Sequence, residues 1–331
     1  MIIVRTPTRV SFCGGGSDLP AFYQKHGGAV LTAGLARYVY LSVHPYFYTD
    51  RLMCKYSKSE EAGQPSELKH PIFRVLLEKF GVNGVEIATN ADVPAGTGLG
   101  SSSSFTVGLL HTLYAYTGKY VSPDRLAAEA CHTEIELLGE PIGKQDQYAA
   151  AFGGLHVFRF RPDGSVATEP VIMAPESMAR LEKNLLMFYT GDLRSASAIL
   201  AEQGRNVATD SDKEKAQLKI LGLVDELHKE LVSGNIDAMG GLLHAGWEQK
   251  RSLASGISNP LIDDAYVKAL AAGATGGKLL GAGGGGFLLF YVPEHRHNAV
   301  KNALSHLRYM EFGFARSGST VIYVGDKPQG Y

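Results

Sequence analysis

One segment rich in glycine and serine, PAGTGLGSSSS at residues 94–104, constrains this chain more than any other. It follows a predicted strand over residues 84–89 and precedes a predicted helix over residues 105–116. Glycines let a backbone turn tightly and approach a ligand closely, because no Cβ intervenes. The first N–H groups of a helix lack partners within it, and the helix dipole favours anions at that end. Residues 94–104 therefore predict a phosphate-binding loop.

This loop differs from the two common phosphate-binding patterns. A Walker A loop needs a lysine, which is absent here, and a dinucleotide fingerprint needs a glycine where Ser101 stands. The alternative is an ordinary glycine turn with one serine capping the helix. Four consecutive serines exceed what one cap requires, so we favour phosphate binding.

Composition excludes several classes of protein. The 331 residues suffice for two domains, and a net charge of −1 gives no sign of nucleic-acid binding. No apolar run is long enough to cross a membrane, and the N-terminus lacks the pattern of a signal peptide. The cysteines Cys13, Cys54 and Cys131 are few and far apart, which favours a reducing compartment over a disulfide framework. We expect a cytoplasmic protein without nucleic-acid or membrane partners.

The remaining pattern predicts an α+β protein with a domain boundary near residues 175–183. The predicted strands of the first part cover residues 2–4, 9–12, 29–35, 37–44, 155–160 and 166–173, with a turn at Pro7 between the first two. The predicted helices of this part cover residues 71–80 and 122–138. The second part is predicted as a strand over 185–189, helices over 212–231, 236–253 and 259–271, a strand after the glycines at 281–286, a helix over 294–307 and a strand over 320–325.

Two further glycine-rich segments are candidates for ligand contact. Residues 13–20, CGGGSDLP, are either a loop held close to a ligand or an ordinary loop. Residues 281–286 contain the spacing Gly-x-Gly-x-x-Gly, but they lead into a strand instead of a helix, so the dinucleotide context fails.

Together these motifs resemble those of the GHMP kinase family, which includes galactokinase, homoserine kinase and mevalonate kinase. The resemblance rests on residues 5–10 with 14–18, on 94–104, and on 280–287, and it spans nearly the whole chain. It implies a two-domain GHMP kinase fold. Residues 1–180 would form an ATP-binding N-terminal domain like ribosomal protein S5 domain 2, and residues 181–331 a ferredoxin-like α/β sandwich.

Within the family, the chain looks most like the heptose-phosphate branch. The segments GGGSD at 14–18, GKQDQ at 143–147 and RSAS at 194–197 carry this resemblance. It implies that ATP, with Mg²⁺, phosphorylates the anomeric hydroxyl of D-glycero-D-manno-heptose 7-phosphate to give heptose 1,7-bisphosphate for GDP-heptose and surface polysaccharide synthesis. The alternative is an L-fucokinase-like or galactokinase-like sugar-1-kinase acting on an unphosphorylated sugar.

The resemblance also implies a role for individual residues. The general base would be Asp146, with Arg9 beside it, and the Mg²⁺ ligands would be Ser102 and Glu134. The residues implied in ATP binding are Pro94, Gly96, Thr97, Gly98, Leu99, Gly100, Ser101, Ser102 and Ser103. The residues implied in sugar binding are Gly15, Gly16, Ser17, Asp18, Lys144, Arg194, Gly283 and Gly284, with Lys144 and Arg194 as candidates for the distal phosphate.

Other interpretations stay open at this point. Glu134 could be a solvated helix carboxylate, Asp146 a helix cap, and Lys144 a solvated cation. A dinucleotide oxidoreductase would need a helix after residues 281–286, and a non-catalytic sugar sensor would require loss of Asp146 or Glu134, both of which are present. Whether the chain forms a homo-oligomer is left open.

Overall fold

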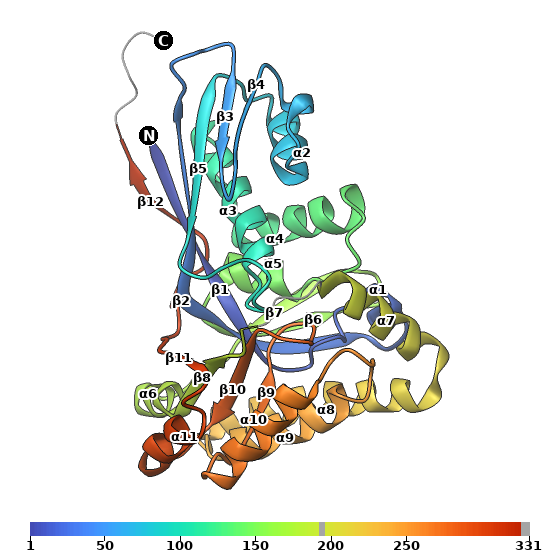
Figure 1. The fold of residues 1–331 in the computed structure, drawn as a ribbon. Helices are drawn as coiled ribbons and strands as arrows, with labels where there is room; N and C mark the ends of the chain where they lie inside the picture. Colours follow the sequence, from blue (N-terminus) through green and yellow to red (C-terminus); the bar gives the residue numbers. More distant parts are fainter. Residues whose placement is uncertain (192–195, 326–331) are drawn as a thin grey trace.

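A long mixed sheet forms the upper part of the molecule in the computed structural model, which describes residues 1–191 and 196–325 (Figure 1). Its path is β12-β1-β2-β5-β3-β4, and β6 and β7 extend it from the other half of β2. The bounds are β1 (Ile2–Cys13), β2 (Gly28–Pro45), β3 (Leu52–Lys55), β4 (Ser59–Ala62), β5 (Val85–Ala91), β6 (Leu155–Phe160), β7 (Val166–Pro170) and β12 (Thr320–Val324). All neighbours among these strands pair antiparallel except β3 and β5.

The first two strands are longer than the sequence predicts. The turn expected at Pro7 is wrong, because β1 runs through it as one strand, and the strands predicted over 29–35 and 37–44 are one strand, β2. The pairing of β1 with β2 shifts register between Pro7 and Thr8, so the proline sits at an irregularity in the ladder. Proline lacks an N–H group and is tolerated at such irregularities.

Strand β2 changes partner halfway along its length. Residues from Val39 onward pair with β5, whereas residues up to Ala33 pair with β6. Arg9 of β1 lies opposite Gly34, at this change. The segment after β5 therefore leaves the sheet close to the middle of β1, and this segment is the predicted phosphate-binding loop.

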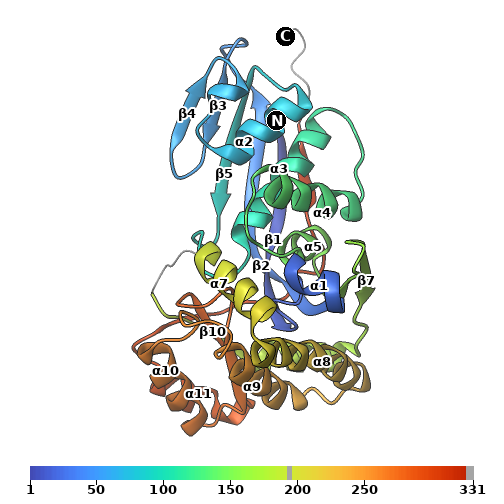
Figure 2. The same ribbon diagram turned by 90° about the vertical axis from the view of Figure 1, so that its right-hand side faces the viewer.

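Helices cover one face of this sheet (Figures 1 and 2). They are α2 (Pro71–Phe80), α3 (Ser101–Tyr116), α4 (Pro123–Cys131) and α5 (Gln145–Phe152), with a short 3₁₀ turn η1 (Pro65–Glu67) before α2. Their apolar faces pack on β2 and β5 in one buried cluster that includes Leu41, Ile87 and Leu110. Helix α3 begins at Ser101, four residues before the predicted start.

The helix predicted over 122–138 changes character partway. It is α-helical as far as Cys131, and residues His132–Leu137 then form a π-helical turn, η2. Such turns are rare and occur often at functional sites. The π-helical turn carries Glu134, one of the predicted metal ligands.

A smaller antiparallel sheet, ordered β11-β8-β10-β9, forms the lower part. Its strands are β8 (Leu185–Tyr189), β9 (Gly276–Leu279), β10 (Phe287–Tyr291) and β11 (Arg308–Met310). The accompanying helices are α6 (Pro175–Asn184), α7 (Ala196–Thr209), α8 (Ser211–Ser233), α9 (Ala238–Lys250), α10 (Pro260–Ala271), η3 (Glu294–Arg296) and α11 (His297–Ala303), and α1 (Pro20–His26) packs against α7. The long helix predicted over 212–231 is confirmed, and β11 was not predicted.

The two parts share a core. Side chains of β1 and β2 pack with side chains of α8, α9 and β8 in a second buried cluster that includes Val10, Leu31 and Val224. The final described strand, β12, returns to pair with β1, so the first and last described strands lie side by side in the larger sheet (Figure 1). The α+β class is confirmed, and the boundary at residue 180 stays a prediction. Within residues 1–191 and 196–325, no helix is both long enough and apolar enough to cross a membrane.

Candidate active site

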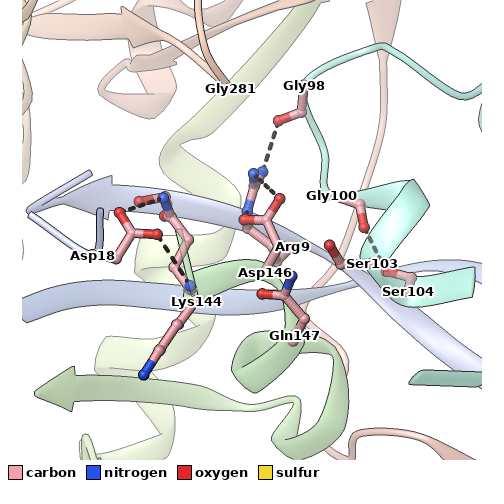
Figure 3. Close-up of polar contacts among 12 residues, drawn as sticks. Arg9, Asp18, Gly98, Gly100, Ser103, Ser104, Lys144, Asp146, Gln147 and Gly281 are labelled. Carbon is pink, nitrogen blue, oxygen red and sulfur yellow. Dashed lines mark hydrogen bonds and ion pairs between the residues drawn. The ribbon is translucent and has the colours of Figure 1, made fainter. Parts of the chain in front are cut away.

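Arg9 and Asp146 form a two-armed ion pair at the centre of the candidate site (Figure 3). Arg9 Nε donates to Asp146 Oδ1 at 2.7 Å, and Nη2 donates to Oδ2 at 2.8 Å. The remaining arm, Nη1, donates to the carbonyl of Gly98 at 2.7 Å. Arg9 is only 5% exposed, so the pair is held in one orientation by the strand and by the loop above it.

Two glycines allow the loop to lie this close to the pair. A Cβ on Gly100 would lie 3.2 Å from Arg9 Cγ and 3.2 Å from Asp146 Oδ2, and Gly100 has a φ of +72°. A Cβ on Gly98 would lie 2.8 Å from the carbonyl oxygen of Leu280. Side chains at these positions would push the loop away from the ion pair and from the C-terminal part.

Of the serines that follow Gly100, some make hydrogen bonds within the protein, and at least one leaves its hydroxyl without a partner among the described residues. Ser104 Oγ donates to the carbonyl of Pro7 at 2.8 Å, and Ser103 Oγ donates to Glu134 Oε2 at 2.8 Å. Ser102 is exposed and its hydroxyl makes no hydrogen bond within the described residues. No side chain caps α3 at Gly100, so the alternative of an ordinary glycine turn with a serine cap is wrong. These amides stay available to an anion.

Glu134 is a buried carboxylate held by three donors. Besides Ser103, it accepts a hydrogen bond from Thr106 Oγ1 at 2.8 Å on Oε1 and one from the Gln147 amide on Oε2. The side chain is 2% exposed, and burial raises the pKa of this carboxyl while the three hydrogen bonds oppose the rise. The interpretation of Glu134 as a solvated helix carboxylate is therefore wrong.

Asp18 ties two loops together. Its carboxylate accepts hydrogen bonds from the backbone N–H of Gly16 at 3.0 Å, the backbone N–H of Gln145 at 3.1 Å and the Gln145 side-chain amide at 3.1 Å. Burial raises the pKa of this carboxyl above its ordinary value. Ser17 instead turns toward β2, where its hydroxyl bonds both backbone groups of Ala29.

The C-terminal glycine segment packs on the phosphate-binding loop. A Cβ on Gly281 would lie 2.6 Å from Gly98 Cα, and one on Gly286 would lie 2.4 Å from the carbonyl oxygen of Thr97. Gly284 donates its N–H to the carbonyl of Ile257 at 3.0 Å. Residues 281–286 link strands β9 and β10, which confirms that a strand follows them and excludes the dinucleotide arrangement.

A cavity of about 480 Å³ collects most of the predicted site residues. Those that line it are Arg9, Gly15, Gly16, Asp18, Gly96, Gly98, Gly100, Ser101, Ser102, Ser103, Glu134, Asp146 and Gly283. Those that do not are Ser17, Pro94, Thr97, Leu99, Lys144 and Gly284. Thr97 and Leu99 are fully buried and shape the loop from behind.

Lys144 does not reach the cavity, contrary to its predicted role on the distal phosphate. Its Nζ donates to the carbonyl of Gly164 at 2.7 Å and lies 4.9 Å from the centre of the Tyr23 ring. Figure 3 shows the side chain directed away from Asp18. The other predicted cation, Arg194, lies outside the described residues.

Sequence reasoning missed several residues that line the cavity. They are Ser11, Leu19, His70, Pro71, Ile72, Gln203, Lys250 and Lys278. Leu19 lies within the glycine-rich segment 13–20, and Ser11 and Lys278 lie beside the motifs at 5–10 and 280–287. The other five come from elements that reach the cavity through tertiary packing, which no local pattern signals.

The site has room and donors for a nucleotide with a divalent cation. The N-terminus of α3 is uncapped and faces the cavity, as a phosphate group requires. Mg²⁺ in kinases is held by one or two protein oxygens together with substrate phosphates and water. The open hydroxyl of Ser102 and the fourth lone-pair position of Glu134 match that donor set.

Comparison with known proteins agrees with this geometry. Residues 68–154 match the GHMP kinases N terminal domain, and residues 227–308 match the GHMP kinases C terminal domain; together they cover half of the chain. The chain belongs to the GHMP kinase family.

Individual relatives resemble the chain over nearly its full length. It is 27% identical to D-glycero-alpha-D-manno-heptose 7-phosphate kinase of Campylobacter jejuni, covering 96% of this chain and 97% of the relative. It is 26% identical to galactokinase of Pyrococcus furiosus, covering 92% of each. The crystal structure of a D-glycero-D-manno-heptose 1-phosphate kinase from Bacteroides thetaiotaomicron superposes with a TM-score of 0.81 at 24% identity, covering 98% of this chain and all of the other.

Proposed function

We propose that this protein is a kinase that transfers the γ-phosphate of ATP to the anomeric hydroxyl of a sugar, with D-glycero-D-manno-heptose 7-phosphate as the acceptor. The observation that carries the proposal is that the Arg9–Asp146 pair faces the same cavity as the uncapped N-terminus of α3. A carboxylate held by a guanidinium and a free set of helix amides are the groups that phosphoryl transfer to a hydroxyl requires.

Each side of the cavity has a separate task in this mechanism. The amides at residues 100–103 would hold the β- and γ-phosphates, and Ser102 and Glu134 would hold Mg²⁺, which neutralises phosphate charge when bound. Asp146 would accept the proton of the sugar hydroxyl. Arg9 would fix the orientation of Asp146, because two of its nitrogens bond both carboxylate oxygens.

Asp18, with Gly15 and Gly16, would bind the sugar on the opposite wall from α3. The Asp18 carboxylate already accepts three hydrogen bonds, so it has one position left for a sugar hydroxyl. Gly283 would contribute backbone from the C-terminal part. Arg194 stays a candidate for the distal phosphate.

The choice of heptose phosphate rests on the relatives and on the segments GGGSD and GKQDQ. Two relatives carry heptose phosphate kinase names, and each matches the chain over nearly its whole length. Galactokinase, at 26% identity, supports the second candidate, a kinase for an unphosphorylated sugar. If the acceptor is heptose 7-phosphate, the product enters GDP-heptose and surface polysaccharide synthesis, and the enzyme would act in the cytoplasm, where ATP is present.

The two proposed domains would be residues 1–180 and residues 181–331.

A coupled assay of ADP release tests this proposal. The purified chain would be given ATP, Mg²⁺ and, in turn, heptose 7-phosphate, the same heptose without phosphate, galactose, fucose and mevalonate. Turnover of heptose 7-phosphate with product phosphorylated at the anomeric carbon is the expected result. Turnover of galactose or fucose alone would replace the acceptor and keep the kinase chemistry, whereas turnover of no sugar would overturn the proposal.

A further inference from the structure

Two lysines that the mechanism does not use face the cavity. Lys278 of β9 is 7% exposed, and its Nζ donates to the carbonyls of Ser11 at 2.8 Å and Phe12 at 2.9 Å. Lys250 is the last residue of α9, and its Nζ donates to the carbonyl of Gly281. An ammonium group has three donors, so at least one donor of Lys278 and two of Lys250 remain.

Neither lysine has a carboxylate partner in the described part of the chain. Asp146 is paired with Arg9, and the Asp18 carboxylate accepts its hydrogen bonds from Gly16 and Gln145. No ion pair within residues 1–191 and 196–325 includes Lys250 or Lys278. A buried ammonium without a countercharge is costly, so an anionic ligand would be stabilising here.

Burial and neighbouring positive charges also act on the pKa values of the two lysines. Burial and the nearby Arg9 lower the pKa of Lys278 to about 8. Burial, followed by Lys278 and Arg9, lowers the pKa of Lys250 well below its ordinary value, and Asp18 opposes that change. An anion bound between the two ammonium groups would restore their charge.

Ser11 supplies an independent sign of a ligand. Its side chain is 7% exposed and lines the same cavity, yet its hydroxyl has no hydrogen-bond partner within the described residues. Buried hydroxyls are rarely left without a partner. A Cβ on Gly15 would lie 3.8 Å from this oxygen, so the glycine loop passes beside the hydroxyl without giving it a hydrogen-bond partner.

Ser11 lies at a distance from the Arg9–Asp146 pair along strand β1. Arg9 and Ser11 are two residues apart on β1, so they share a face and lie about 7 Å from one another along the strand. Arg9 marks the position of Asp146. An acceptor whose reacting hydroxyl lies at Asp146 would therefore extend about 7 Å to bring a second group to Ser11.

We propose that Lys250, Lys278 and Ser11 bind a phosphate group that the acceptor sugar already carries, which makes the acceptor a sugar monophosphate. This inference rests on the proposed kinase function and specifies its acceptor. The cavity thus has two anion sites, one at the N-terminus of α3 for ATP and one at the lysines for the acceptor.

Kinetics of K250M test the assignment, because methionine keeps the length of the side chain and removes the charge. The expected result is a KM for heptose 7-phosphate raised roughly 10- to 100-fold, with a much smaller change in the KM for ATP. The variant loses the charged hydrogen bond to the acceptor together with the hydrogen bond to the Gly281 carbonyl. Turnover of the same heptose without its phosphate should fall far less in K250M than turnover of heptose 7-phosphate. S11A should raise the same KM by a smaller factor.

K268M is the matched control, because Lys268 lies on α10, pairs with Asp264 at 2.7 Å and does not line the cavity. An equal loss of kcat for both acceptors in K250M would assign Lys250 to the γ-phosphate of ATP and overturn the proposal. An unchanged KM for heptose 7-phosphate in K250M would overturn it as well.

Calorimetric titration with heptose 7-phosphate, without ATP, separates this proposal from the kinase proposal. Weaker binding to K250M than to wild type supports the phosphate site even if no sugar is turned over, in which case the kinase function alone fails. Equal binding to both proteins overturns the phosphate site and leaves the kinase function standing.

Discussion

Gly281 and Gly98 meet backbone to backbone: a Cβ added to Gly281 would lie 2.6 Å from the Cα of Gly98. Gly281 follows β9 in the lower part of the molecule. Gly98 belongs to the phosphate-binding loop, and its carbonyl accepts a hydrogen bond from Arg9. The smaller sheet therefore supports the phosphate-binding loop from behind. Gly281 also has a φ of +76°, which side chains rarely adopt.

We predict that G281A is less stable and nearly inactive. The added methyl meets backbone that cannot move without displacing the loop, and the left-handed φ adds strain, so the free energy of unfolding should fall by about 1–3 kcal/mol. Urea unfolding and ADP release measure the two effects. G222A is the control: Gly222 lies in α8 with nothing within 4 Å, so alanine there should raise stability by about 0.5–1 kcal/mol. Wild-type activity in G281A would contradict the supporting role of this contact.

D146N should lower kcat by about 10²- to 10⁴-fold and leave the KM for ATP nearly unchanged. The amide cannot accept the proton of the sugar hydroxyl, whereas the amides of α3 that face ATP stay in place. Steady-state ADP release measures both constants. D212N, at an exposed aspartate in the first turn of α8, should match wild type. A kcat within threefold of wild type for D146N would reject Asp146 as the base.

The local patterns of the sequence account for much of the fold. Helix α8 could be predicted because Ile220, Val224, Leu227 and Leu231 repeat at helical spacing, and all four are buried. The single strand β1 could not be predicted. Pro7 lacks the N–H group that a regular ladder needs, and a register shift in the pairing with β2, about thirty residues further along the chain, accommodates it. Propensity describes a residue and its neighbours, whereas the shift depends on pairing.

The site divides in the same way. Arg9, Asp146 and Glu134 could be predicted because family motifs contain them, and all three line one cavity. Lys144 lies in such a motif as well, but its direction is set by the turn at Gly164, which no motif describes. Lys250 carried no local signal, because its position depends on α9 packing beside the glycines after β9.

Ser102 and Ser104, which lie in the same turn of α3 but make different contacts, provide a test of the metal site. S102A should leave stability unchanged and raise the Mg²⁺ concentration needed for half-maximal activity by about 10-fold, because its open hydroxyl faces the cavity. S104A should lose about 1 kcal/mol of stability, because its hydroxyl bonds the carbonyls of Pro7 and Gly100, and its Mg²⁺ requirement should not change. Magnesium titrations of activity and thermal unfolding of both variants give the comparison. The same Mg²⁺ requirement in S102A and wild type would exclude Ser102 as a ligand.

E134Q should separate activity from stability. An amide nitrogen in place of Oε1 can donate to Thr106, while the amide oxygen still accepts from Ser103 and Gln147, so the hydrogen-bond network survives. Burial raises the pKa of Glu134, which means that its charged form is disfavoured in the fold, and the neutral amide should therefore give an equal or higher free energy of unfolding at pH 7. Activity at limiting Mg²⁺ should fall at least 10-fold. A variant that is clearly less stable than wild type would mean that Glu134 is required for the fold and not for the metal.

Lys278 should leave a signature in the pH dependence of stability. Its pKa is about 8 in the folded protein and 10.5 in the unfolded chain, so between these values the unfolded state binds more protons. The free energy of unfolding contributed by this group therefore rises as pH increases from about 8 to 10.5. In K278M this rise should be missing, so the stability of wild type minus that of K278M should increase across the window. Urea unfolding of both proteins at pH 7.5, 8.5 and 9.5 measures the difference, and K268M, whose lysine is half exposed and paired with Asp264, should track wild type. If the difference in the free energy of unfolding between wild type and K278M stays constant with pH, Lys278 keeps its ordinary pKa. The cavity would then not disfavour the charged form of this lysine.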